Sequence, residues 1–138
     1  MTEKVFVYGT LRQGQQYHNL IADYVKSMHK AKTRGILYDL PYGYPAMIFG
    51  DGCVCGEIFA LDDAEKALAI LDELENYHGP GEDNEYDRRE IAVTAEDGSV
   101  HTCYVYVYPE NRRDWLEQHG IRVTDGDWVR ARKGNNSG

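Results

Sequence analysis

Hydrophobic and polar positions alternate along this chain in short runs that glycines and prolines separate. The first run, residues 4–8, is β-branched and apolar on both faces, which is typical of a central, doubly buried strand. Glycines and prolines between residues 41 and 52 predict turns, and Glu96-Asp97-Gly98 predicts a hairpin. The further strands that the pattern predicts are residues 33–38, 46–49, 53–61, 86–95 and 100–108.

The pattern also predicts three helices, at residues 17–26, 63–77 and 112–119. The middle helix has the clearest beginning, because Asp62-Asp63-Ala64-Glu65 places a glutamate three positions after an aspartate cap. Many strands with few helices favour a small mixed or closed sheet decorated by helices. We expect one domain over residues 1–130 and a flexible tail over residues 131–138. The apolar positions of the middle helix recur on one face and are Ala64, Ala67, Leu68, Leu71 and Leu74.

Composition narrows the classes of partner. The chain has 138 residues and a formal net charge of −8. Such an acidic surface repels phosphate backbones, so we expect no nucleic-acid partner. No apolar run approaches the roughly 20 residues that cross a bilayer, so we expect no membrane association. The cysteine count is odd and low for a secreted disulfide scaffold, which favours a cytoplasmic location, and the oligomeric state stays open.

Glu75 is the one acidic residue inside the apolar stripe of the middle helix, between the angular positions of Leu68 and Ala64. A carboxylate there is unfavourable unless it is paired, neutralised or faces a cavity. Burial raises the pKa of such a group toward the range used for proton transfer near neutral pH. Glu75 is therefore either an acid/base group or a residue that leans into solvent or pairs with Arg88 or Arg89.

The loop Tyr8-Gly9-Thr10-Leu11 follows the first strand directly. Gly9 is able to adopt positive φ and to let ligand atoms approach the backbone. Consecutive amides in such a turn form a nest for a carboxylate or an oxyanion, and Thr10 adds a hydroxyl. A plain tight turn is the alternative, and no phosphate-loop pattern occurs in the chain.

Taken together, these pieces resemble the γ-glutamylcyclotransferase-like family, which includes the γ-glutamylamine cyclotransferases. Each piece is short, but their order and completeness make the set specific. The first is VFVYGTLRQG at residues 5–14, and LDELE at residues 71–75 contains the family's catalytic glutamate. The other matching pieces are residues 18–20, 44–46, 54–59, 86–89, 104–108 and 126–128.

The resemblance implies an α+β fold, a small mixed β-barrel with flanking helices. It implies an enzyme that needs no cofactor and performs an intramolecular aminoacyl transfer, releasing 5-oxoproline and a free amine from a γ-glutamyl amine or peptide. Glu75 would be the general acid/base, and Tyr8, Gly9, Thr10 and Leu11 would bind the substrate. We add Tyr106 to the substrate-binding set, because it alternates with two other tyrosines onto one face of a strand. The leaving amine stays open.

Two alternatives stand beside this interpretation. A non-catalytic module that binds an anionic or γ-glutamyl small molecule would need the same loop, and turnover would distinguish it from the enzyme. Cys53-x-Cys55 and His101-x-Cys103 would form a zinc site if their strands were neighbours. Their spacing differs from that of a usual zinc finger, so we expect no metal.

Overall fold

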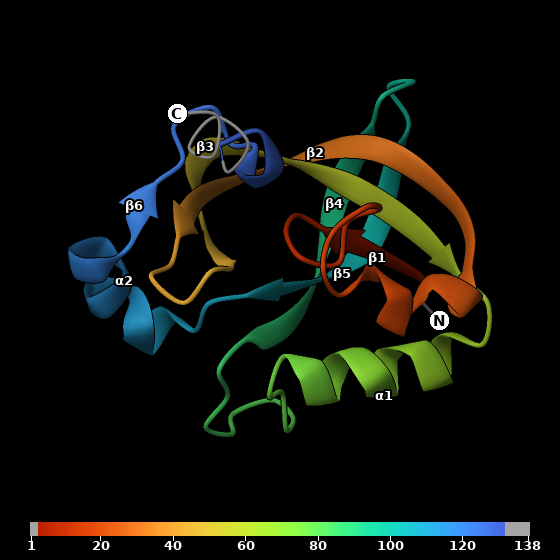
Figure 1. Ribbon diagram of the computed structural model, residues 1–138, viewed down its shortest axis with the longest axis horizontal. Coiled ribbons are helices and arrows are strands. Elements are labelled where there is room, and N and C mark those ends of the chain that lie inside the picture. Colours follow the sequence, from red (N-terminus) through yellow and green to blue (C-terminus); the bar gives the residue numbers. More distant parts are fainter. Residues whose placement is uncertain (1–2, 132–138) are drawn as a thin grey trace.

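A mixed β-sheet that curls into a barrel forms the centre of the protein (Figure 1). The computed structural model describes residues 3–131. Its strands are β1 (Lys4–Val7), β2 (Val25–Asp39), β3 (Pro45–Leu61), β4 (Asp87–Ala95), β5 (Val100–Val107) and β6 (Ile121–Arg122). Its helices are α1 (Ala64–Leu74) and α2 (Arg113–His119), with 3-10 turns η1 (His18–Leu20), η2 (Ala22–Tyr24) and η3 (Glu110–Arg112).

The barrel closes because β2 pairs with strands on both of its sides. The strand order is β3-β1-β5-β4-β2, and β2 also pairs with β3, so the first and last strands of the series join. All of these pairings are antiparallel except that of β1 with β5, which makes the sheet mixed. The α+β fold with a small mixed barrel expected from the sequence is confirmed. The strand predicted at residues 4–8 is the central strand β1, and its apolar side chains are buried.

Strands β2 and β3 form one long antiparallel ribbon, where the sequence predicted three shorter strands. The turn predicted at Gly50 and Gly52 is wrong, because β3 continues through both glycines. The pairing shifts register between Arg34 and Ile36, opposite these glycines. A side chain at Gly52 would have its Cβ 2.5 Å from the carbonyl oxygen of Gly35. The glycines therefore mark a bulge with close backbone approach, which glycine also signals inside strands.

The helix predicted at residues 17–26 is also wrong. Two 3-10 turns occupy its first part, and β2 begins at Val25, where it pairs with Leu61 of β3. The pairing requires an extended backbone from Val25 onward, so a continuous helix is excluded there. The apolar side of the segment still packs inward at Ile21, which is fully buried. Of the expected tail at residues 131–138, all but the first residue lies outside the described residues.

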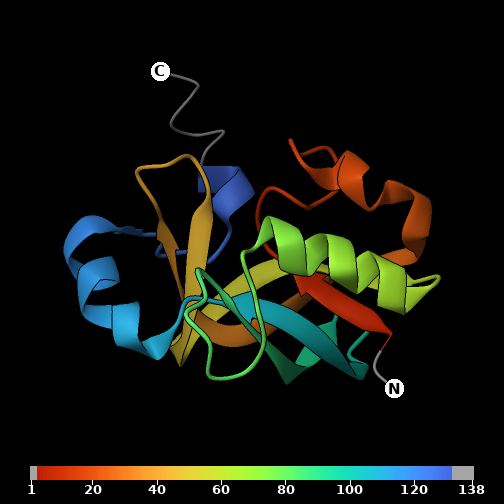
Figure 2. The same ribbon diagram turned by 90° about the horizontal axis from the view of Figure 1, so that it is seen from below.

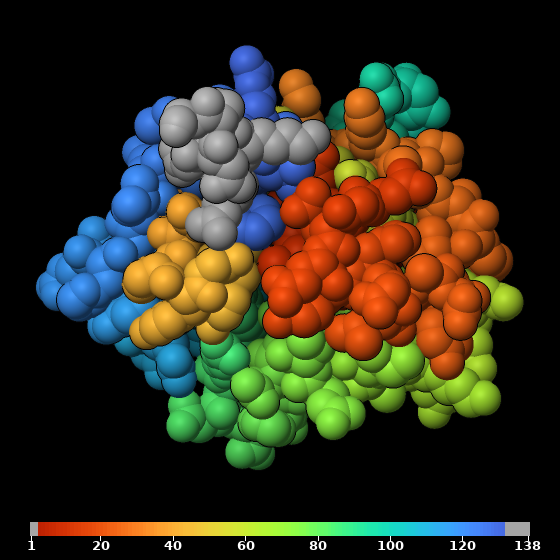
Figure 3. Space-filling model, in the orientation of Figure 1, coloured from red at the N-terminus to blue at the C-terminus, as the bar shows by residue number. Residues whose placement is uncertain are grey.

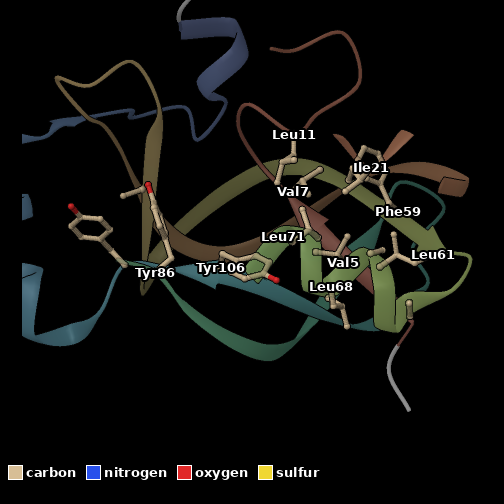
Figure 4. Packing of buried hydrophobic residues seen from close by; sticks show 14 of the residues in the cluster. Val5, Val7, Leu11, Ile21, Phe59, Leu61, Leu68, Leu71, Tyr86 and Tyr106 are labelled. Carbon is tan, nitrogen blue, oxygen red and sulfur yellow. The ribbon is translucent and has the colours of Figure 1, made fainter. Parts of the chain in front are cut away.

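Helix α1 lies across the outside of the barrel and closes one half of the core (Figure 2). Its buried residues are Ala64, Ala67, Leu68 and Leu71, as the pattern predicts. Leu68 and Leu71 pack over Val5 and Val7 of β1 (Figure 4). The helix begins after the N-cap Asp63 and ends at Leu74, three residues earlier than predicted. Glu75 therefore follows the last helical residue directly and is the C-cap of the helix.

We expect Gly52→Ala to destabilise the fold, because the new methyl group would press against the backbone carbonyl of Gly35. Overpacking of this kind typically lowers the free energy of unfolding by about 1–3 kcal/mol. Asp51→Ala is the matched control, since the Asp51 side chain is 98% exposed and pairs with exposed Arg34. Urea unfolding measures both variants. Equal midpoints for Gly52→Ala and the unmodified protein would contradict the close approach described above.

Candidate active site

A pocket of about 190 Å³ opens between the end of α1, the loop after β1 and strand β5. The six residues that the sequence assigned to catalysis or binding all line it, although they come from three separate segments. Tyr106 lies between Leu71 and the wall formed by Tyr86 (Figure 4). The predicted residues in the lining are Tyr8, Gly9, Thr10, Leu11, Glu75 and Tyr106.

Glu75 is the C-cap of α1, and its backbone amide donates to the carbonyl of Leu71 at 2.9 Å. Its carboxyl group makes no hydrogen bond or ion pair within residues 3–131. Burial, together with the negative charge of Glu85, raises the pKa of Glu75 to about 8. The alternative pairing with Arg88 does not form, because Arg88 binds Asp72 at 2.8 Å instead. The carboxyl group is thus available to a ligand and holds its proton at neutral pH.

Glu85 is a second carboxylate in the lining of this pocket, and the sequence did not single it out. It accepts hydrogen bonds from the Tyr44 hydroxyl at 2.8 Å and from the Asn76 side-chain amide at 3.0 Å. Both donors are neutral, so the charge of Glu85 still acts on Glu75. Glu85 sits in a polar loop without periodicity, so the pattern of the sequence does not single out this residue.

The loop after β1 lines the pocket together with the end of α1. In Figure 3 the red surface of the N-terminal segment adjoins the green surface that includes α1. Gly9 does not adopt the positive φ that the sequence allowed. Glycine fits there for a different reason, because a Cβ would lie 2.5 Å from the Pro45 ring. Leu11 anchors the loop in the core. Within residues 3–131, the amides of Gly9, Thr10 and Leu11 donate to no acceptor.

A buried ion cluster beside the loop holds it in place. The Arg12 guanidinium binds the carboxylate of Glu57 at 2.9 Å and that of Asp127 at 3.0 Å. Glu57 also accepts from the backbone amide of Gln13 at 2.8 Å. The cluster joins the loop to β3 and to the C-terminal segment. The three charged residues fall in stretches that carried the family resemblance, but no pattern of the sequence pairs them.

Tyr106 and Tyr8 are tied to the protein by their hydroxyl groups. The Tyr106 hydroxyl donates to Asp72 at 2.7 Å, and Asp72 in turn pairs with Arg88. The Tyr8 hydroxyl donates to the backbone carbonyl of Tyr106 at 2.6 Å. Burial raises the pKa of both hydroxyls, so neither is ionised near neutral pH. These bonds fix the positions of two tyrosines in the pocket wall.

The cysteines do not assemble into the zinc site considered above. Cys55 belongs to β3 and Cys103 to β5, and β1 lies between these strands in the sheet. Within the described part of the chain, no group of three or more histidine, cysteine or acidic residues is placed to hold a metal ion. No helix among residues 3–131 is long and apolar enough to span a membrane.

The fold and the pocket define a small barrel protein in which a carboxyl group of raised pKa shares a pocket with loop amides that have no acceptor within residues 3–131. The profile of the family described as γ-glutamyl cyclotransferase, AIG2-like, matches residues 5–130. The chain belongs to this family and is an enzyme of the γ-glutamylcyclotransferase class.

Individual relatives agree with this membership. The γ-L-glutamyl-butirosin B γ-glutamyl cyclotransferase of Niallia circulans is 38% identical over 135 residues, covering 97% of this chain and 80% of that enzyme. The γ-glutamylaminecyclotransferase of Mus musculus is 26% identical over 132 residues, covering 81% of this chain and 82% of that protein. The crystal structure of YkqA from Bacillus subtilis shares the fold, with a TM-score of 0.74 at 23% identity over 100% of this chain and 44% of its own.

The raised pKa of Glu75 predicts a pH-dependent gain in stability for Glu75→Gln. Between pH 4.5, the ordinary pKa of glutamate, and about pH 8, the folded protein keeps this proton while the unfolded chain loses it. The stability of the unmodified protein therefore falls as pH rises through this window. We expect the variant to gain about 2–4 kcal/mol relative to it by pH 8 and no more above that. Urea unfolding at several pH values measures the difference, and a pH-independent difference would contradict the raised pKa.

Proposed function

We propose that this enzyme converts a γ-glutamyl amide into 5-oxoproline and a free amine, with Glu75 as the general acid and base. The observation that carries the proposal is the carboxyl group of Glu75, whose pKa is raised to about 8 and which shares one pocket with the amides of residues 9–11. A group that titrates near neutral pH is suited both to accept and to donate a proton in one catalytic cycle.

The reaction needs one proton acceptor before any bond changes. The α-amine of the substrate is mostly protonated at neutral pH and is then not a nucleophile. Glu75 in its ionised form takes this proton, and the free amine attacks the γ-carbonyl carbon of the same molecule. Because both reacting groups belong to one substrate, ring closure gains the advantage of proximity without a bound co-reactant.

The second half of the reaction returns the proton. The attack forms a bond between the α-nitrogen and the γ-carbonyl carbon and gives a tetrahedral intermediate with a negative oxygen. Collapse of this intermediate breaks the bond to the leaving nitrogen, which takes the proton held by Glu75. The attacking nitrogen carries two protons after the attack and releases one to the regenerated Glu75 carboxylate, which passes it to the released amine. The products are 5-oxoproline and the amine, and all atoms of the substrate are accounted for without water.

The amides of Gly9, Thr10 and Leu11 supply the other requirement. Since they have no acceptor within residues 3–131, they are available to the substrate carboxylate or to the oxygen that becomes negative during the attack. Preorganised amides of this kind stabilise developing negative charge more effectively than water does. The Arg12 cluster keeps the loop rigid, and rigidity is what makes such donors effective.

Loss of the acid/base group is the direct test of this function. We expect the unmodified enzyme to release 5-oxoproline over many turnovers from at least one member of a panel of γ-glutamyl amines and peptides, measured by mass spectrometry. Glu75→Gln keeps the shape but cannot transfer the proton, so kcat should fall by about 10²–10⁴-fold. Glu73→Gln is the matched control, because Glu73 is exposed on the same helix. Equal losses in both variants would contradict a specific role for Glu75.

The pH dependence of kcat/KM reports the same group. Glu75 must be ionised to accept the proton from the amine, so kcat/KM should rise with pH and level off near the pKa of about 8. Below that value we expect a rise of about tenfold per pH unit. An acidic limb with its midpoint near the ordinary pKa of a glutamate would show that Glu75 is not the titrating base.

A further inference from the structure

A second, larger pocket adjoins the one just described. We call the second pocket the outer pocket and the first one the inner pocket. The volume of the outer pocket is about 470 Å³, and that of the inner pocket is about 190 Å³. The two share Tyr44 and Glu85, so they meet at these side chains. The outer pocket lies where the β2–β3 loop approaches α2 (Figure 1). Its lining residues are Tyr42, Tyr44, Glu85, Tyr108, Asn111, Arg112 and Trp115.

Aromatic side chains form the walls of the outer pocket. Tyr42 and Trp115 stack with their ring planes 7° apart and their centroids 6.0 Å apart, and Tyr108 packs against the other side of the cluster at 6.3 Å from Trp115. Tyr42 remains 60% exposed, although it is a large aromatic residue on a short loop. Faces of tyrosine and tryptophan attract cations through the ring quadrupole, which gives these walls a preference beyond simple apolar contact.

The carboxylate where the pockets meet has no cationic partner in the described part of the chain. Glu85 accepts only from the neutral groups of Tyr44 and Asn76. The cation Arg112 also lines the outer pocket, where its guanidinium pairs with Asp83 at 3.7 Å and not with Glu85. The carboxyl group of Glu85 therefore lies where the two pockets meet, beside aromatic faces, and this combination is the chemistry that recognises an ammonium group.

We propose that the outer pocket binds the leaving group of the substrate and favours one that carries a positive charge. This inference rests on the proposed function, which places the γ-glutamyl part in the inner pocket beside Glu75. The leaving amine must then point out of that pocket, and the shared residues Tyr44 and Glu85 mark the way into the outer one. Glu85 is thus a specificity-determining residue, which pairs with the distal charge of the leaving amine while Tyr42 and Trp115 cover its alkyl chain.

Three matched substrates separate charge from size. They are the γ-glutamyl amides of pentanediamine, hexylamine and aminohexanoate, whose leaving groups have the same length and end in an ammonium, a methyl and a carboxylate group. We expect kcat/KM for the ammonium compound to exceed that for the methyl compound by about tenfold, with the carboxylate compound the poorest. Release of 5-oxoproline is the readout for all three.

Glu85→Gln is the decisive variant, because glutamine keeps hydrogen-bonding capacity toward Tyr44 and Asn76 but loses the charge. The ratio of kcat/KM between the ammonium and methyl compounds should fall to about one. Glu85 also faces Glu75, Tyr86 and Tyr108, and its loss changes the titration of Glu75. That change affects all three substrates alike, so it cancels in the ratio.

Two further variants complete the design. Glu82→Gln removes a charge from an exposed position of the same loop and should leave the ratio unchanged. Tyr42→Ala removes one aromatic wall at an exposed residue, where the fold is not at risk, and should lower the ratio severalfold. Three results would overturn the assignment of the outer pocket and leave the proposed function standing. They are equal kcat/KM for the ammonium and methyl compounds, a preference for the carboxylate compound, and an unchanged ratio in Glu85→Gln. Absence of 5-oxoproline from every compound would contradict the proposed function and this inference with it.

Discussion

The long pairing of β2 with β3 is the constraint on which the rest of the structure depends. It closes the barrel, because without it the series of strands from β3 to β2 would have two free edges. The same ribbon places Tyr44 and Pro45 at its turn, beside the loop after β1. Glu57 belongs to β3 of the ribbon and forms a salt bridge with Arg12 of that loop. One backbone pairing thus sets both the closure of the sheet and the position of the pocket wall.

The site combines several unfavourable arrangements that the fold tolerates. Glu75 lies at the C-terminal end of α1, where the partial negative charge of the helix disfavours a carboxylate. It is also desolvated and faces a second acid, Glu85. Each of these effects raises the free energy of the ionised form. A group held in this way is poised to exchange protons near neutral pH, and part of the stability of the fold is given up for it.

The sequence predicted the buried face of α1 well, because the period of a helix fixes which residues share a side. Glu75 follows Leu68 and Leu71 onto the buried face without any knowledge of the tertiary structure. The strand at the start of residues 4–11 was predicted equally well, since a doubly buried strand has a distinctive composition. The two segments come together through the packing of α1 on β1, which the helical pattern did not predict. The family resemblance implied only that both segments serve one site.

Other features depend on contacts between distant segments and left no local signal. Hydrogen bonds from Tyr44 and Asn76 hold Glu85 in the pocket wall. The composition of a polar loop does not predict which residues will form such bonds. Gly50 and Gly52 resembled turn residues, because glycine marks close approach inside a strand as readily as a reversal of the chain. The 3-10 turns before β2 replaced a helix for a similar reason, since the pairing of Val25 with Leu61 outweighs local preference.

The ion cluster of Arg12, Glu57 and Asp127 also makes three distant parts of the chain depend on one another. Loss of one carboxylate would leave Arg12 paired with the other alone, and loss of Arg12 would leave two acids together in a mostly buried place. Breaking a buried pair at one partner is far more damaging than replacing the whole group by apolar residues. The three positions are therefore coupled energetically, so the effects of substitutions at two of them on the free energy of unfolding should not add. A change at Asp127 in the C-terminal segment reaches the loop after β1 through Arg12.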